Sequence, residues 1–120
     1  MMQPTILIVE DDEPLATLFR EALEAITPHI DIALNGQEAL AYLDANQPDL
    51  VLLDLHLPRV SGTNVFKRIR QDPRLVDTKV VLVTADAAMA SWLHEEADLV
   101  LEKPVLPSQL QVLARRLLSA

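Results

Sequence analysis

The chain has 120 residues and a formal net charge of −8, and half of its residues are hydrophobic. This length suits one domain, which we expect to span residues 1–120. Only 3% of the residues are aromatic, so aliphatic side chains must fill the core. The acidic balance argues against direct binding of nucleic acid by this domain.

The sequence also excludes several classes of protein. It contains no cysteine, which rules out disulfides, thiolate nucleophiles and cysteine-ligated metals. No apolar run approaches the roughly 20 residues that span a bilayer, and the N-terminus lacks the pattern of a signal peptide. We therefore expect a cytoplasmic protein without membrane contact.

Strand and helix patterns alternate along the first half of the chain. The continuous apolar run 6–9 is typical of a strand buried on both faces. Apolar residues at helical spacing follow, namely Leu15, Leu18, Phe19, Ala22, Leu23 and Ile26. Pro14 suits the first turn of this helix. A short strand over residues 30–33 and a helix over residues 36–43 come next.

The second half continues the alternation. Apolar runs predict further strands over residues 50–53, 80–83 and 99–101. The third helix ends at Asp72-Pro73, the fourth includes Met89 and Trp92, and the fifth begins near Pro107. The predicted apolar stripe of the fifth helix consists of Leu106, Leu110, Leu113 and Leu117.

This order of elements predicts an α/β fold with three layers. Five strands that alternate with five helices form a doubly wound parallel sheet, with right-handed crossovers and helices on both faces. In the flavodoxin-like strand order 2-1-3-4-5, a ligand binds at the carboxyl ends of strands one and three. The residues at those two strand ends are therefore the first candidates for a site.

Carboxylates stand at both of these strand ends. Glu10, Asp11 and Asp12 follow the first strand, and Asp54 follows the third. Carboxylates this close repel one another, and a hard cation such as Mg²⁺ relieves the repulsion. We therefore favour a cation site. The alternative is that the first three residues merely cap the first helix, a role that suits Asp12 and Glu13.

A hydroxyl group and an ammonium group are predicted at the same edge of the sheet. Thr84 ends the fourth strand, and Lys103 follows the fifth. Taken alone, Thr84 could cap a helix and Lys103 could be solvated. Together with a carboxylate nucleophile and a divalent cation, they make a set that can bind a phosphoryl group.

Four motifs in this order give the chain a resemblance to a known family. They are residues 6–12, Asp54-x-x-x-Pro58-x-x-x-Gly62, Thr84-Ala85 and Lys103-Pro104. Each motif alone is weak, but the ordered set at the predicted strand ends is specific. Over its whole length the chain resembles the receiver domains of two-component response regulators.

The resemblance implies a phosphoacceptor and its metal ligands. Asp54 would attack a phosphohistidine on a sensor histidine kinase or a phosphotransfer protein. Mg²⁺ would be bound by Asp11, by Glu10 through water, by Asp54 and by the backbone carbonyl of His56. The chain would therefore act as a signalling phosphoacceptor that assists its own phosphorylation and dephosphorylation, and not as an enzyme.

The resemblance also implies how the phosphoryl group is read out. Thr84 would swing toward the phosphoryl oxygens and Lys103 would pair with them, with a cis bond to Pro104. The added charge would draw the neighbouring loops inward and present a changed surface to a downstream effector protein or domain. A homodimer through the face of the fourth helix, fifth strand and fifth helix is a further candidate.

The sequence departs from the family pattern around the fourth helix. Val100 stands where the family usually has Tyr or Phe, so rotation of an aromatic ring cannot be the readout. Thr84 and Lys103 are 19 positions apart, closer than is usual, so the fourth helix or its loops should be about one turn short. Trp92 on that helix has two interpretations, as a core anchor or as a contact for a partner.

Two further residues occupy positions that influence hydrolysis rates in the family. These are His56 and Asp86. Asp86 could orient an attacking water or repel the phosphoryl group. Alternatively, both residues are solvated parts of loops.

Three rival functions fit the residues less well than this interpretation. A haloacid-dehalogenase type of enzyme needs a second aspartate two residues after the nucleophile, where this chain has His56. A nucleotide-binding domain would need a glycine-rich motif, but the chain has only two glycines, which are too few for such a motif. A receiver that binds its partner without being phosphorylated, as a protein interaction module, is the more serious alternative.

Overall fold

The computed structural model describes residues 3–119 and confirms the predicted fold. Five parallel strands form one sheet in the order β2-β1-β3-β4-β5. They are β1 (Ile6–Val9), β2 (Ile30–Ala33), β3 (Leu50–Asp54), β4 (Lys79–Thr84) and β5 (Leu99–Glu102). The helices are α1 (Glu13–Leu23), α2 (Gly36–Ala45), α3 (Gly62–Gln71), the 3₁₀ turn η1 (Pro73–Leu75), α4 (Ala87–Leu93) and α5 (Pro107–Ser119).

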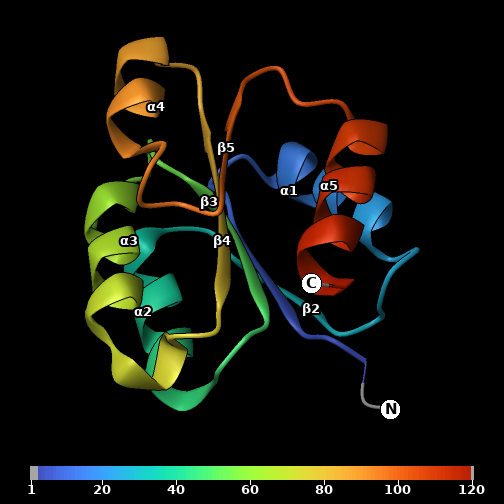
Figure 1. Cartoon of the computed structure of the whole chain (residues 1–120), viewed down its shortest axis with the longest axis horizontal. Coiled ribbons are helices and arrows are strands. Elements are labelled where there is room, and N and C mark those ends of the chain that lie inside the picture. The colour runs from blue at the N-terminus through green and yellow to red at the C-terminus, as the bar shows by residue number, and fades with distance from the viewer. Residues whose placement is uncertain (1–2, 120) are drawn as a thin grey trace.

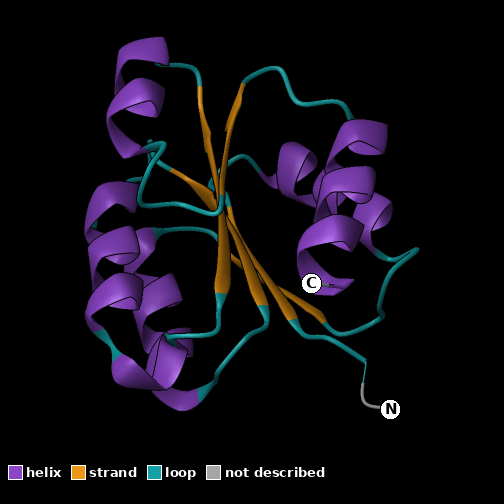
Figure 2. Cartoon of the chain, viewed as in Figure 1, coloured by secondary structure: helices purple, strands orange, loops and turns teal. Residues whose placement is uncertain are grey.

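Helices cover both faces of the sheet. Figure 1 shows α1 and α5 on one side, and α2, α3 and α4 on the other. The strands form the middle layer, drawn in orange between the purple helices in Figure 2. Each face of the sheet packs against its helices in a separate hydrophobic core, and alternate residues of β3 belong to the two cores. Leu50 and Leu52 pack toward α1 and α5, whereas Val51 and Leu53 pack toward α2 and α3. Among the described residues, no helix is both long and apolar enough to cross a membrane.

The strand register brings the carboxyl ends of the central strands to one edge. Val9 of β1 pairs with Leu53 of β3, so the residues that follow β1 lie beside Asp54. Thr84 of β4 pairs with Glu102 of β5. Every candidate residue that the sequence placed after a strand is therefore carried to the same edge.

The predicted apolar stripes are wider than the surface that the sheet covers. Leu18 of α1 is 42% exposed, and Leu106, which precedes α5, is 62% exposed. Helix α1 also ends at Leu23, and Ile26 packs against the core from the following turn. Helical periodicity assigns every apolar residue on one side of a helix to the buried face. The sheet and the neighbouring helix, however, bury only the middle of that side.

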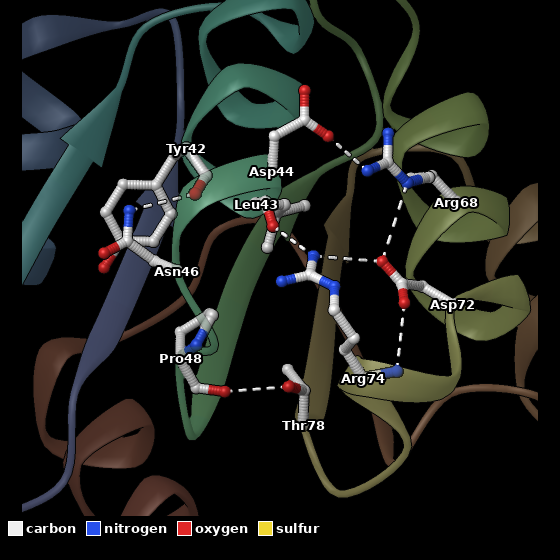
Figure 3. Close-up of polar contacts among 9 residues, drawn as sticks. All are labelled: Tyr42, Leu43, Asp44, Asn46, Pro48, Arg68, Asp72, Arg74 and Thr78. Carbon is white, nitrogen blue, oxygen red and sulfur yellow. Dashed lines mark hydrogen bonds and ion pairs between the residues drawn. The ribbon is translucent and has the colours of Figure 1, made fainter.

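An ion-pair network joins α2, α3 and η1 at the opposite edge of the sheet (Figure 3). Arg68 of α3 pairs with Asp44 of α2, and its side chain lies 3.8 Å from Asp72. Arg74 of η1 pairs with Asp72 at 3.1 Å and donates to the carbonyl of Leu43 at 2.6 Å. Asp72 also accepts the backbone N–H of Arg74 at 2.9 Å and so caps η1.

We expect Asp72→Asn to destabilise the fold in a pH-dependent way. The backbone N–H of Arg74, its guanidinium group and Arg68 hold the pKa of Asp72 below its usual value of 3.8. This stabilisation is present above the pKa of the unfolded chain and is lost as the pH falls through the folded value. The variant should therefore unfold at lower urea than wild type near neutral pH, and the difference should close below about pH 4.

Urea denaturation over a pH series measures this effect. Asp77→Asn is the control, because Asp77 is an exposed acid two residues before β4. A difference between Asp72→Asn and wild type that stays constant down to low pH would contradict the assignment.

Candidate functional site

Three carboxylates meet at the carboxyl ends of β1 and β3. Glu10, Asp11 and Asp54 each place a carboxylate oxygen within 4.8 Å of the others. Glu10 and Asp54 are buried, whereas Asp11 is exposed. Two buried carboxylates and one exposed carboxylate form a set of oxygen donors that a small hard cation can reach from solvent. This set fits Mg²⁺, which binds a few carboxylates and keeps several waters.

The start of α1 fixes the position of Glu10. The backbone N–H of Glu10 donates to the carbonyl of Ala33 at 3.0 Å, so the sheet pairing continues one residue beyond β1. The backbone N–H of Asp12 donates to Glu10 Oε2 at 3.2 Å. The side chain of Asp12 in turn accepts the N–H of Leu15 at 3.1 Å. Asp12 is thus the predicted helix cap and is not one of the three grouped carboxylates.

Lys103 supplies the positive charge between the two buried carboxylates. Its Nζ lies 3.3 Å from Glu10 Oε1 and 3.4 Å from Asp54 Oδ2. Its backbone N–H donates to the carbonyl of Thr84 at 2.8 Å, which ties the chain after β5 to the end of β4. Partial burial opposes the charge, but Asp54 and Glu10 together raise the pKa of Lys103. The bond from Lys103 to Pro104 is cis, as the resemblance implied.

Thr84 and His56 complete the site beside Asp54. Thr84 is fully buried, and its Oγ1 lies 3.4 Å from Nε2 of His56. The backbone N–H of His56 donates to Asp54 Oδ1 at 3.0 Å and so orients the carboxylate. His56 is exposed, yet it contacts two site residues through different atoms, which the interpretation as a solvated loop residue did not anticipate.

Asp86 caps α4 and links it to the site. Its side chain accepts the N–H groups of Ala88 and Met89 at 3.0 and 3.1 Å. Its own backbone N–H donates to Oγ1 of Thr84 at 3.0 Å. Thr84 is therefore not the helix cap that its sequence position also allowed. The start of α4 is instead connected to the Thr84 hydroxyl through the backbone N–H of Asp86.

The buried carboxylates repel each other. Burial, and next the charge of Asp54, raise the pKa of Glu10 from 4.5 to about 7, while Lys103 works in the opposite direction. A cation held between these carboxylates would favour their charged forms.

Gly62 allows the chain to pass close behind Asp54. A Cβ atom on Gly62 would lie 2.5 Å from Cα of Leu55 and closer still to the carbonyl oxygen of Asp54. The N–H of Gly62 also donates to the carbonyl of Leu55 at 3.2 Å. This close approach explains physically why the Asp54 motif ends in glycine.

The fourth helix is short, as the sequence predicted. Helix α4 has only seven residues, which agrees with the short spacing between Thr84 and Lys103. Trp92 on this helix is 86% exposed, which excludes its interpretation as a core anchor.

Residues 6–115 match the family model of the response regulator receiver domain. The chain belongs to this family. This receiver is 41% identical over 86 residues to the polar-differentiation response regulator DivK of Brucella anthropi, covering 72% of this chain and 70% of that protein.

Two further relatives show how far the similarity extends. The phosphate regulon transcriptional regulatory protein PhoB of Rhizobium meliloti is 35% identical over 120 residues, or 98% of this chain. The chain spans 53% of that relative, so it matches about half of the longer protein. The crystal structure of a putative response regulator from Chloroflexus aurantiacus superposes with a TM-score of 0.90. That match has 29% identity and covers 99% of this receiver and 100% of the other chain.

We expect Glu10→Gln to stabilise the receiver at high pH when no divalent cation is present. Because the pKa of Glu10 is raised, the folded state binds more protons than the unfolded state between pH 4.5 and about 7. Stability therefore falls as the pH rises through this window. Wild type and variant should have similar free energies of unfolding near pH 4. Near pH 8 the free energy of unfolding of the variant should be larger by about 1–2 kcal/mol.

Urea denaturation in the presence of a chelator measures this difference. Added Mg²⁺ should reduce this difference in stability, because a ligand stabilises the protein that binds it more tightly, and wild type keeps the Glu10 carboxylate. A variant that is less stable than wild type at every pH would disprove the electrostatic explanation.

We expect Gly62→Ala to disturb Asp54 directly. The added methyl group should displace the backbone at Asp54 and Leu55, at a cost of about 1–3 kcal/mol in the free energy of unfolding. Ser61→Ala is the matched control, because it removes the cap that binds the N–H of Asn64, at a cost of about 1 kcal/mol. Amide NMR resonances of Asp54 and Leu55 should shift in Gly62→Ala and stay in place in the control. The reverse pattern would contradict the proposed contact.

Proposed function

We propose that residues 1–120 form a receiver domain in which Asp54 accepts a phosphoryl group. The donor would be a phosphohistidine on a sensor histidine kinase or a phosphotransfer protein. The observation that supports this most strongly is the position of the buried Asp54 carboxylate, 3.4 Å from Lys103 Nζ and grouped with Glu10 and Asp11. In the transfer, an Asp54 oxygen bonds to phosphorus as the bond to the histidine nitrogen breaks, and the imidazole leaves.

Glu10, Asp11 and Asp54, together with the backbone carbonyl of His56, would hold Mg²⁺. The cation would supply positive charge that offsets the carboxylates and the incoming phosphoryl oxygens. The N–H bond from His56 to Asp54 Oδ1 keeps one carboxylate oxygen engaged and leaves the other near Lys103. The protein thereby presents one oxygen of Asp54 toward the donor.

Lys103 and Thr84 would bind the transferred group. The phosphoryl group adds about −1.5 to −2 charge and three strong acceptors, so the Lys103 ammonium would move from the carboxylates to it. The Thr84 hydroxyl would turn to donate to a phosphoryl oxygen. This rotation weakens the bond that Thr84 Oγ1 now accepts from Asp86, and Asp86 caps α4. The geometry thus gives a route from the phosphoryl group to α4 that needs no aromatic residue at position 100.

The domain would act in the cytoplasm as a signalling phosphoacceptor and not as an enzyme with an external substrate. Its output would be a shift between two arrangements of α4 and the adjoining loops, read by an effector protein or an output domain. The acidic charge does not suit direct binding of nucleic acid by this domain. Homodimer contacts through α4, β5 and α5 remain a prediction.

Phosphorylation can be tested by intact mass. After incubation with Mg²⁺ and an acyl phosphate, the wild-type chain should gain one phosphoryl group, because Asp54 has both the cation site and Lys103 beside it. Asp54→Asn should gain none, and Asp11→Asn should react at least about tenfold more slowly, because it keeps the nucleophile but loses a metal ligand. Asp49→Asn is the control at the opposite end of β3 and should react like wild type.

The outcomes separate the alternatives. A gain of mass in Asp54→Asn would move the acceptor to another residue. No gain in wild type, with the fold intact, would favour the receiver that acts as an interaction module without phosphorylation.

A further inference from the structure

Helix α4 presents an unusual apolar feature to solvent. Trp92 is the only tryptophan of the chain, and its 86% exposure is the highest among the large hydrophobic side chains in residues 3–119. A groove of about 350 Å³ lies beside it, lined by Met89 and Leu93 of α4 and Thr63 of α3. Figure 1 shows α4 at one end of its layer, beside α3. Exposed tryptophans next to apolar grooves are typical of the energetic centres of protein interfaces.

The other side of α4 has a hollow of a different character. It measures about 370 Å³ and lies between α4 and β5. Its lining includes the small side chains Ala87 and Ala90 and the half-buried Val100. Glu95 and Glu102 border it, and both are exposed. A short side chain at position 100 leaves this space open to a side chain from outside.

The charge around α4 has one sign. Residues 85–102 include five acidic residues and no lysine or arginine. Asp86 caps the helix, and Asp98 pairs with Arg70 at 2.8 Å. Glu95 and Glu102 have no ion-pair partner within the described part of the chain. The exposed acids therefore offer their charge to a partner.

We propose that this α4 surface, made of Trp92, its groove and the hollow beside Glu95 and Glu102, binds a basic amphipathic helix of a partner protein. Apolar side chains of that helix fill the groove against Trp92. A lysine or arginine enters the hollow, lays its aliphatic stem on Val100 and pairs with the two glutamates. Charge complementarity favours this occupant over a homodimer, because a second copy brings another net charge of −8, and over an anionic membrane surface, which the acidic residues repel.

The surface adjoins the elements that carry the site. Glu102 immediately precedes Lys103 and pairs in register with Thr84. Asp86, which caps α4, donates its backbone N–H to the Thr84 hydroxyl. If α4 has two arrangements, as in the proposed function, a partner that binds one of them more tightly would couple its binding to phosphorylation. The inference of the partner itself depends on the surface alone, so it can fail or hold independently of phosphorylation.

Binding can be measured with a synthetic probe and the complete, unphosphorylated chain. The probe is a peptide with leucines at helical spacing on one face, lysines and arginines on the other, and no tryptophan. A matched peptide has glutamates in place of the basic residues. Because Trp92 is the only tryptophan, its fluorescence should shift to the blue and saturate with the basic peptide, and should not respond to the acidic one.

Variants locate the contact, with the affinity followed by anisotropy of a labelled basic peptide. Trp92→Ala should weaken binding at least about tenfold, as expected for an interface centre. The double change Glu95→Gln and Glu102→Gln should weaken binding by a similar factor, and Val100→Tyr should do so by filling the hollow. Glu21→Gln with Glu24→Gln removes the same charge from exposed positions at the C-terminal end of α1 and should leave the affinity unchanged.

Four results would overturn the proposal. The first two are binding of neither peptide by wild type and equal binding of both. The third is a loss of affinity in the α1 control pair as large as in the α4 pair, which would show general electrostatic attraction. Finally, sedimentation velocity could reveal self-association that Trp92→Ala abolishes, which would make a second copy the occupant.

Discussion

The structure depends on holding Glu10 and Asp54, two buried carboxylates, beside each other at the end of a parallel sheet. Register alone brings them together, because Val9 pairs with Leu53 and the next residue of each strand is acidic. Water cannot screen this repulsion well at a buried site, and burial together with the charge of Asp54 raises the pKa of Glu10. Lys103 offsets part of it from a loop that is itself tied to β4. The acidic pair, its cationic neighbour and the backbone that positions them form one unit.

The same unit explains how much the sequence could predict. Buried parallel strands are recognisable as apolar runs, and the residue after each run must lie at the sheet edge, so Asp54, Thr84 and Lys103 could be placed from pattern alone. Side-chain partners within that edge could not be predicted in this way. The residue type of Thr84 allowed it to cap a helix, but the structure gives the cap of α4 to Asp86, for which the sequence pattern did not predict this role. The steric need for Gly62 likewise arises from a loop that no periodicity describes.

Packing at the outer surface was the least predictable feature. Leu18, Leu106 and Trp92 are all apolar residues at helical spacing, yet all three are exposed, because burial depends on what lies opposite. For Leu18 and Leu106 the explanation is the limited width of the contact with the sheet and the neighbouring helix. Trp92 differs from them because α4 has only seven residues and leaves a groove and a hollow on its two sides.

The contacts at the two ends of α4 indicate where it can move. At its C-terminal end, Arg70 donates to the carbonyl of Glu96 at 3.0 Å, pairs with Asp98 at 2.8 Å and lies over the ring of Phe66. This clamp joins the loop after α4 to α3. The N-terminal end depends on one hydrogen bond to the hydroxyl of Thr84, a group that can rotate. In the proposed function, a helix fixed at one end and held by a rotatable group at the other would pivot about the fixed end. Phosphorylation of Asp54 would then reach the α4 surface mainly through its first turn.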